Sequence, residues 1–460
     1  MALIASVSAG AQGVKIYLKG YSNPIDYPAS TIDRIEFYPS ENNPDNPDNP
    51  DNPNIPGDTS DKKYLEETGV ELLNQIKAND FNGIVKSVES LDDIDEGDLD
   101  AWGEECLNAA KTVLSGTYSK TDRHGYTYYV TDYKYLIKAS GFTGHFKAQG
   151  GRWVKESNAN DLQFTFTDNN GKTCVARIAT SGSTKTIHVG DFENYDRYRN
   201  GYEYYENQKT YIDVPQHIDA TYSINGTTRV QVTADIDVST LGEEWDLASQ
   251  GASVKVTAVV NKENGGKYSV NINRAGYQAG TGAFVEFSIS NDNKVIISGK
   301  AAAAGTLNIN VRNTTEEPDV RPEDFGAADA NIDILGRVQL KTTINSIGNF
   351  FTYLEDANDN SENKNEHRRL VGRANSELNA AFYYNNGTDK RGTLELESFE
   401  KDSWGSRYYY DTRLIIKFTS DNSSYDIGSY FNEDAFQTVI DAYKNLLDDF
   451  ERLTKRSARQ

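Results

Sequence analysis

Runs of alternating apolar and polar residues, joined by short turns, dominate the chain between residues 118 and 312. Side chains of a β-strand point alternately to its two faces, so a period of two predicts strands. Parallel strands need long crossover connections, usually helical, and this region has no such pattern, so we expect an antiparallel meander. Four pairs of runs meet at turns whose residues tolerate a left-handed backbone: Asn169-Asn170-Gly171, Asn225-Gly226, Gly265-Gly266 and Asp292-Asn293.

Helical spacing appears on both sides of these strands. Apolar residues recur at helical intervals over 62–80, 81–90 and 96–116, the last with Gly116 as its expected end. Further helices are expected at 347–358, 363–382 and 432–455, with a hairpin at Asn385-Asn386-Gly387 between the last two. The predicted fold class is α+β: a main domain over 59–460 rich in antiparallel meander, with helices at both ends and a candidate subdivision near 313–331.

Proline recurs at every third position from Pro44 to Pro53; Asn precedes each of these prolines, and Asp45, Asp48 and Asp51 lie between them. Proline fixes φ and lacks an amide donor, so the repeat excludes helix and sheet, and the residue before each proline is driven to extended conformations. We therefore predict that 41–58 is an extended linker of polyproline-II type, at roughly 3.1 Å per residue. A calcium-binding repeat is disfavoured because an extended repeat points successive carboxylates in different directions.

The residues before this linker indicate an extracytoplasmic protein. Ala2 to Val7 is a short apolar run, and Ala9-Gly10-Ala11 has the small-x-small pattern of a signal-peptidase site. We interpret 1–12 as a signal-peptide remnant that lacks the charged first region. An N-terminus that is unstructured or forms a strand is the alternative. The predicted localisation is secreted, periplasmic or cell-surface.

Residues 13–40 alternate in two or three short runs and predict a small β module. One run reads Tyr27-Pro28-Ala29-Ser30-Thr31-Ile32-Asp33-Arg34-Ile35-Glu36-Phe37. It resembles the N-terminal element of uncharacterised secreted and lipid-anchored surface proteins from Bacteroidetes-type bacteria. The resemblance covers about a tenth of the chain; it implies a compartment and no activity.

Charge and ligand chemistry exclude several classes of function. Lys and Arg number 47 against 69 Asp and Glu, a net charge of −22. Nucleic-acid binding needs a basic face because counterion release supplies much of its affinity, so no nucleic-acid partner is expected. No stretch approaches the ~20 apolar residues of a transmembrane helix. The sequence leaves the oligomeric state open.

No metal or cofactor is expected. The five histidines are scattered, and Cys106 and Cys174 lack metal or redox spacing. We predict two free, buried thiols, with a disulfide between them as the alternative. The acidic run 356–363 fails the EF-hand pattern, since Ser361 and His367 stand where a Gly and a Glu are required. It is predicted to be a polar loop between helices.

The candidate ligand-binding residues are Tyr202, Tyr204 and Tyr205, on a tyrosine-dense run beside Gly201 that predicts a protruding hairpin. Exposed aromatic rings can stack on sugar rings, and their hydroxyls can bond to sugar hydroxyls. The alternative is a two-sided hairpin in which tyrosines fill half-buried strand positions. Residues 402–413 carry the same ambiguity.

The sequence contains no serine elbow, phosphate loop or H-E-x-x-H motif. Acid pairs such as Asp235 and Asp237 could serve a glycosidase, but 69 acids generate such pairs without function. We predict a non-catalytic surface protein that binds a glycan or another extracellular polymer. The alternative is a carrier of an apolar ligand between sheet and helices, and a glycan-active enzyme is less favoured.

Overall fold

The structure is a computed structural model that describes residues 13–16, 25–28, 59–99, 101–102, 111–138, 141–192, 197–199, 202–239, 251–305, 324–404, 407–420, 422–430 and 436–455. The chain divides into two units, Met1–Pro56 and Gly57–Gln460. In the first, β1 (Gly13–Ile16) and β2 (Ile25–Pro28) pair antiparallel, as the predicted small β module requires. The predicted signal remnant, the linker prolines and the run at 32–38 lie outside the described residues.

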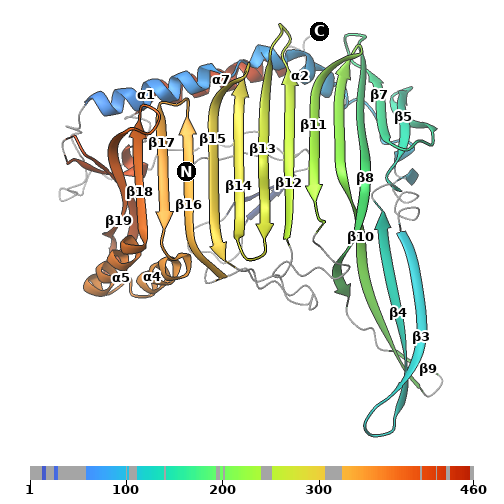
Figure 1. The fold of residues 1–460 in the computed structure, drawn as a ribbon. Coiled ribbons are helices and arrows are strands. Elements are labelled where there is room, and N and C mark those ends of the chain that lie inside the picture. The colour runs from blue at the N-terminus through green and yellow to red at the C-terminus, as the bar shows by residue number, and fades with distance from the viewer. Residues whose placement is uncertain are drawn as a thin grey trace. The chain divides into compact units, whose positions relative to one another are not determined.

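One large sheet forms the second unit, and its strands confirm the predicted class (Figure 1). The strands are β3 (Lys111–Thr121), β4 (Thr127–Lys138), β5 (Gly144–Gln149), β6 (Arg152–Ser157), β7 (Leu162–Thr167), β8 (Thr173–Phe192), β9 (Arg197–Arg199), β10 (Tyr202–Ile224), β11 (Thr227–Asp237), β12 (Gly251–Asn261), β13 (Lys267–Gln278), β14 (Gly282–Asn291), β15 (Lys294–Gly305), β16 (Phe325–Ile334), β17 (Val338–Ile344), β18 (Leu378–Tyr384), β19 (Asp389–Trp404), β20 (Arg407–Phe418) and β21 (Ser424–Asp426).

From β10 to β21 each strand pairs antiparallel with the next, which is the predicted meander. On its other side β10 pairs with β8, and β7, β5 and β6 follow. The β3–β4 hairpin joins along the first half of β10. The expected turns at Asn225-Gly226, Gly265-Gly266 and Asp292-Asn293 all have positive φ.

The two faces of this sheet differ in chemistry. Residues directly opposite one another on neighbouring strands share a face. One row across β11 to β16 is polar: Thr233, Thr257, Asn271, Ser288, Ser298 and Asp333. The adjacent row, on the other face, is apolar: Val256, Ile272, Phe287, Gly299, Ile332 and Leu340. The sheet therefore has a polar face and an apolar face.

Helices cover parts of the apolar face. They are α1 (Thr59–Asn74), the 3₁₀ turn η2 (Ala78–Phe81), α2 (Asn82–Glu89), α4 (Ile347–Asp359), α5 (Lys364–Glu377), α6 (Ile427–Tyr430) and α7 (Gln437–Lys455). Figure 1 shows α1 and α7 running along one end of the strands, with α4 and α5 at the other end. Tyr64 and Leu65 of α1 pack on Phe382 and Tyr384, while Leu370 of α5 belongs to a cluster packed against Leu396.

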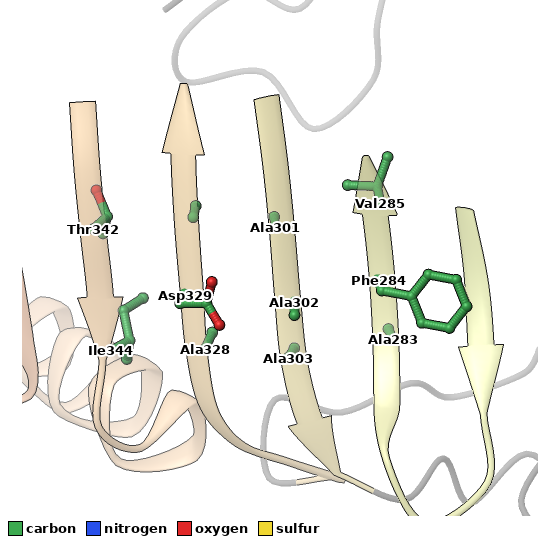
Figure 2. A pocket seen from close by; sticks show the side chains of 11 residues that line it. Ala283, Phe284, Val285, Ala301, Ala302, Ala303, Ala328, Asp329, Thr342 and Ile344 are labelled. Atoms are coloured by element: carbon green, nitrogen blue, oxygen red, sulfur yellow. The ribbon is translucent and has the colours of Figure 1, made fainter. Parts of the chain in front are cut away.

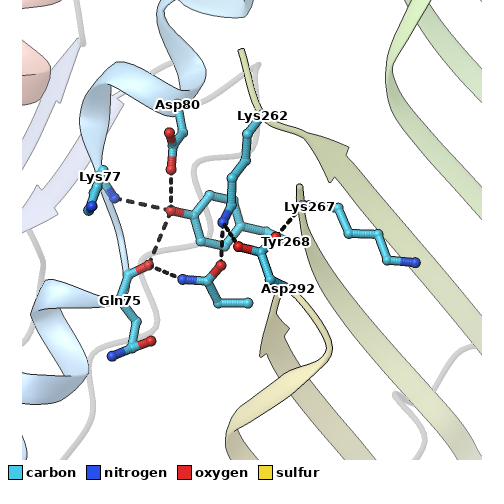
Figure 3. Close-up of polar contacts among 8 residues, drawn as sticks. Gln75, Lys77, Asp80, Lys262, Lys267, Tyr268 and Asp292 are labelled. Carbon is cyan, nitrogen blue, oxygen red and sulfur yellow. Dashed lines mark hydrogen bonds and ion pairs between the residues drawn. The ribbon is translucent and has the colours of Figure 1, made fainter. Parts of the chain in front are cut away.

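The helices along the upper strand ends are fixed to successive hairpin turns. At one junction the Tyr268 hydroxyl lies 2.6 Å from an Asp80 carboxylate oxygen and 3.1 Å from the Gln75 carbonyl, and it accepts from the Lys77 amide (Figure 3). Burial and the hydrogen bond to Asp80 raise the pKa of Tyr268, so this hydroxyl stays protonated. Further along, Arg337 donates to Glu71 at 2.7 Å. The η2 turn therefore contacts the β12–β13 hairpin, and α1 contacts the turn between β16 and β17.

Three expectations are wrong, two about the bounds of helices and one about the pairing of strands. The helix predicted to end at Gly116 gives way to β3 at Lys111, and Cys106 lies outside the described residues. The helix expected over 363–382 ends at Glu377, after which β18 begins at once. The sheet also contains two parallel pairings, β4 with β10 and β5 with β7. Spacing of apolar residues cannot distinguish a strand from a helix over so few residues.

The loop expected over 356–363 is shorter than predicted. Residues 356–359 form the last turn of α4, and 360–363 connect it to α5, whose N-cap is Asn363. Cys174 is a free and fully buried thiol, and burial raises its pKa. Part of the connection expected over 313–331 belongs to β16, which pairs with β15 from Ile297 with Ile334 to Gly305 with Phe325, and residues 313–323 lie outside the described residues.

Candidate functional site

An arm built from β3, β4, β9 and the first half of β10 carries many tyrosines, and Figure 1 shows it extending beyond the ends of the neighbouring strands. We call these residues, 111–138 and 197–213, the tyrosine arm. Its β3–β4 hairpin is exposed from Val113 to Thr127. Tyr118 is 47% and Tyr126 74% exposed, values unusual for aromatic rings in a folded domain.

In the sheet, the predicted residues on β10 lie beside a second run of tyrosines, on β4. Tyr204 lies opposite Tyr129, and Tyr205 lies opposite Val130, in the parallel pairing of β10 with β4. Tyr202 and Tyr204 also pair with Arg199 and Arg197 of β9, which places a hairpin around the predicted position. Nothing further is described for the side chains of Tyr202 and Tyr204.

The described rings of the arm contact one another. The rings of Tyr128 and Tyr205 meet edge to face with centroids 5.0 Å apart. Tyr133 and Tyr135 are stacked at 6.2 Å with an interplanar angle of 19°. The Lys134 ammonium lies 4.2 Å from the centroid of the Tyr211 ring. The two ring pairs lie on opposite faces of the strands and Tyr211 is itself buried, so the arm carries partly exposed aromatic rings on both of its faces.

The residues predicted from the sequence are only part of this surface. The run 126–135 contains five tyrosines, which was a visible signal, but alternation alone assigned it to an ordinary strand. Its position beside Tyr204 and Tyr205 depends on a parallel pairing between strands separated by five others in sequence. Such a long-range pairing leaves no local pattern in the chain.

A second candidate site is a hollow of about 310 Å³ on the apolar face of β14 to β17. Its lining comes mainly from that face: Ala283, Val285, Ala301, Ala303, Ala328, Ala330, Thr342 and Ile344. Figure 2 shows the small alanine side chains between the larger Phe284 and Ile344. Methyl groups on neighbouring strands fill less space than the branched side chains around them, so the sheet is hollowed here.

The acid–histidine pairs have geometry suited to ion pairing. Hydrogen bonds from His145, at 2.7 Å, and from Arg177 lower the pKa of Asp161. Asp235 pairs with His217 at 2.8 Å, and hydrogen bonds from Ser239 lower the pKa of Asp237. A carboxyl group with a lowered pKa stays ionised near neutral pH and is a poor general acid. Among the described residues, no group of three His, Cys, Asp or Glu could hold a metal ion.

Comparisons with family models, curated proteins and solved structures found no match to this chain. Within the part of the chain that the structure describes, no helix is both long and apolar enough to cross a membrane.

Proposed function

We propose that the protein is an extracytoplasmic, non-catalytic binding protein whose tyrosine arm recognises a glycan or another extracellular polymer. The observation that carries this proposal is the register of β4 with β10, which sets the tyrosine run 126–135 beside Tyr204 and Tyr205. Rings along a narrow arm suit successive sugar rings of an extended chain, because each ring can stack on one sugar face.

Binding is tested with a panel of soluble polysaccharides. We expect Tyr204→Ala/Tyr205→Ala and Tyr133→Ala/Tyr135→Ala each to weaken binding by about tenfold or more, since aromatic contacts are worth about 0.5–1.5 kcal/mol each. Tyr443→Ala is the matched control, because Tyr443 is also exposed, at 51%, but lies on α7 outside the arm. Equal binding by the arm variants and the wild type would contradict the proposal.

The non-catalytic part has its own test. The purified protein, incubated for hours with each polysaccharide that it binds, is expected to release no reducing ends. Release that a single Asp or Glu substitution abolishes would identify a glycan-active enzyme instead.

A second candidate function is favoured by the hollow on the apolar face. That face also receives α1 and α5, so a ligand there would lie beside helices, as a carrier of an apolar molecule requires. Its volume is near the lower end of the roughly 300–1,000 Å³ of ligand pockets. Lipid that co-purifies with the wild type and is lost from Ala301→Leu, with polysaccharide binding absent, would favour this function over the first.

A further inference from the structure

A row of charged residues crosses the polar face, opposite the apolar hollow. Neighbours in register place Arg274, Glu286, Lys300, Asn331 and Lys341 side by side on five successive strands, β13 to β17. The signs alternate through Lys300, but Asn331 then stands where an acid would continue the alternation. Two lysines therefore flank an uncharged residue.

Neither lysine has a carboxylate partner among the described residues. Glu286, opposite Lys300, is engaged with Arg274 at 3.8 Å and accepts from Asn273 at 3.2 Å. The Lys341 ammonium donates to the Gly387 carbonyl at 3.3 Å and lies 4.6 Å from the centroid of the Tyr383 ring. These contacts leave its positive charge uncompensated.

A second, independent observation at Asn331 indicates that a ligand can bind here. Its side-chain oxygen is buried and has no hydrogen-bond partner among the described residues. Buried polar atoms are rarely left unpaired, because losing water without a new partner costs roughly 1–3 kcal/mol. An acceptor in this state is suited to a donor from outside the chain.

These residues line one hollow of about 350 Å³. Asp329, Thr343, Asn379 and Tyr383 complete its polar wall. Adjacent strands lie about 4.8 Å apart, so the Cα atoms of Lys300 and Lys341 are roughly 10 Å apart across Asn331. Flexible lysine side chains can converge from that separation on a single anionic group.

We propose that this hollow binds a uronic-acid residue of an acidic polysaccharide. The two ammonium groups bind its one carboxylate, and its hydroxyls donate to the Asn331 amide oxygen and to the Asp329 carboxylate. A phosphate dianion fits less well, because Asp329 would repel its second charge. The site is separate from the tyrosine arm, so it stands or fails independently of the proposed function.

The test uses oligogalacturonate, with neutral glucose oligomers and inorganic phosphate as comparison ligands. Wild-type protein is expected to bind oligogalacturonate in a salt-dependent manner, and phosphate is expected to compete poorly. Lys300→Gln and Lys341→Gln should each weaken binding by about tenfold, as a lost charge-assisted hydrogen bond predicts. Asn331→Asp should have at least this effect, because it changes one atom and places an acid between the lysines.

Two controls separate this site from other causes. Lys267→Gln removes a lysine charge from an exposed position on β13 outside the hollow, so it should retain binding. Tyr204→Ala/Tyr205→Ala should retain uronate binding even where it loses other polymers. Unchanged binding by Asn331→Asp, or absence of uronate binding by the wild type, would overturn the proposal. Equal binding of glucose oligomers, or competition by phosphate as strong as by free galacturonate, would overturn the ligand class.

Discussion

Gly392 of β19 lies directly opposite Phe382 of β18 and Phe418 of β20. A Cβ added there would lie 2.2 Å from a Phe382 ring carbon and 2.3 Å from the Lys417 carbonyl oxygen. The carbonyl belongs to the backbone and cannot move cheaply, so Gly392→Ala should cost about 1–3 kcal/mol of stability. Thermal unfolding measures the loss. Gly116→Ala is the control, because its Cβ would meet nothing within 4 Å; an equal loss there would contradict the steric argument.

His367 makes the unit sensitive to mild acid. It is buried against β19, with Nδ1 2.7 Å from the Ser398 hydroxyl, and burial lowers its pKa. Below about pH 6.5 the unfolded chain binds a proton at this histidine more readily than the folded chain does, so the free energy of unfolding should fall. His367→Gln should flatten this fall between about pH 7 and 5 in thermal unfolding. His124→Gln, at an exposed site, is the matched control. The same slope in wild type and His367→Gln would exclude this histidine as its source.

At the scale of elements, the junction of η2 with the β12–β13 hairpin concentrates stabilising contacts. Tyr268→Phe removes the hydroxyl that joins Asp80, Gln75 and Lys77. Loss of a partner by a partly buried carboxylate and carbonyl should cost about 1–3 kcal/mol. Hydrogen exchange should accelerate over 75–82 before the rest of the unit. Tyr118→Phe, at an exposed ring of β3, should change neither property. Faster exchange elsewhere, with 75–82 unchanged, would contradict the role of this junction.

Local chemistry made some elements predictable and left others hidden. Turns at Asn225-Gly226 and Asp292-Asn293 were predictable because few residues tolerate positive φ. Residues 111–116 were assigned to a helix because their apolar spacing fits both periods. The parallel pairing of β4 with β10 was hidden, and it decides the neighbours of Tyr204 and Tyr205. The hollow around Asn331 was hidden too, since it requires the register of four strands at once.

At the scale of the whole chain, the proline repeat predicts how the protein responds to proteases. The chain divides between Pro56 and Gly57, within the segment 41–58 that the sequence assigns to a linker. Extended, solvated backbone without core contacts is a preferred site of cleavage. Limited proteolysis should therefore cut first between about residues 40 and 60 and leave a stable fragment that ends at Gln460.

The fragment should unfold at the same temperature as the intact chain, because α1 begins at Thr59 and its contacts with β17, β18 and α7 lie within the second unit. Mass spectrometry identifies the cut, and calorimetry compares the two melting temperatures. Cleavage inside the exposed β3–β4 hairpin is the competing outcome, and a first cut there would show that the linker is protected. A melting temperature many degrees lower after cutting at 40–60 would show that the N-terminal module contributes to the stability of the large sheet.

Replacing Pro44, Pro47, Pro50 and Pro53 with alanine keeps the segment polar, so the same cut and the same melting temperature are expected from that variant.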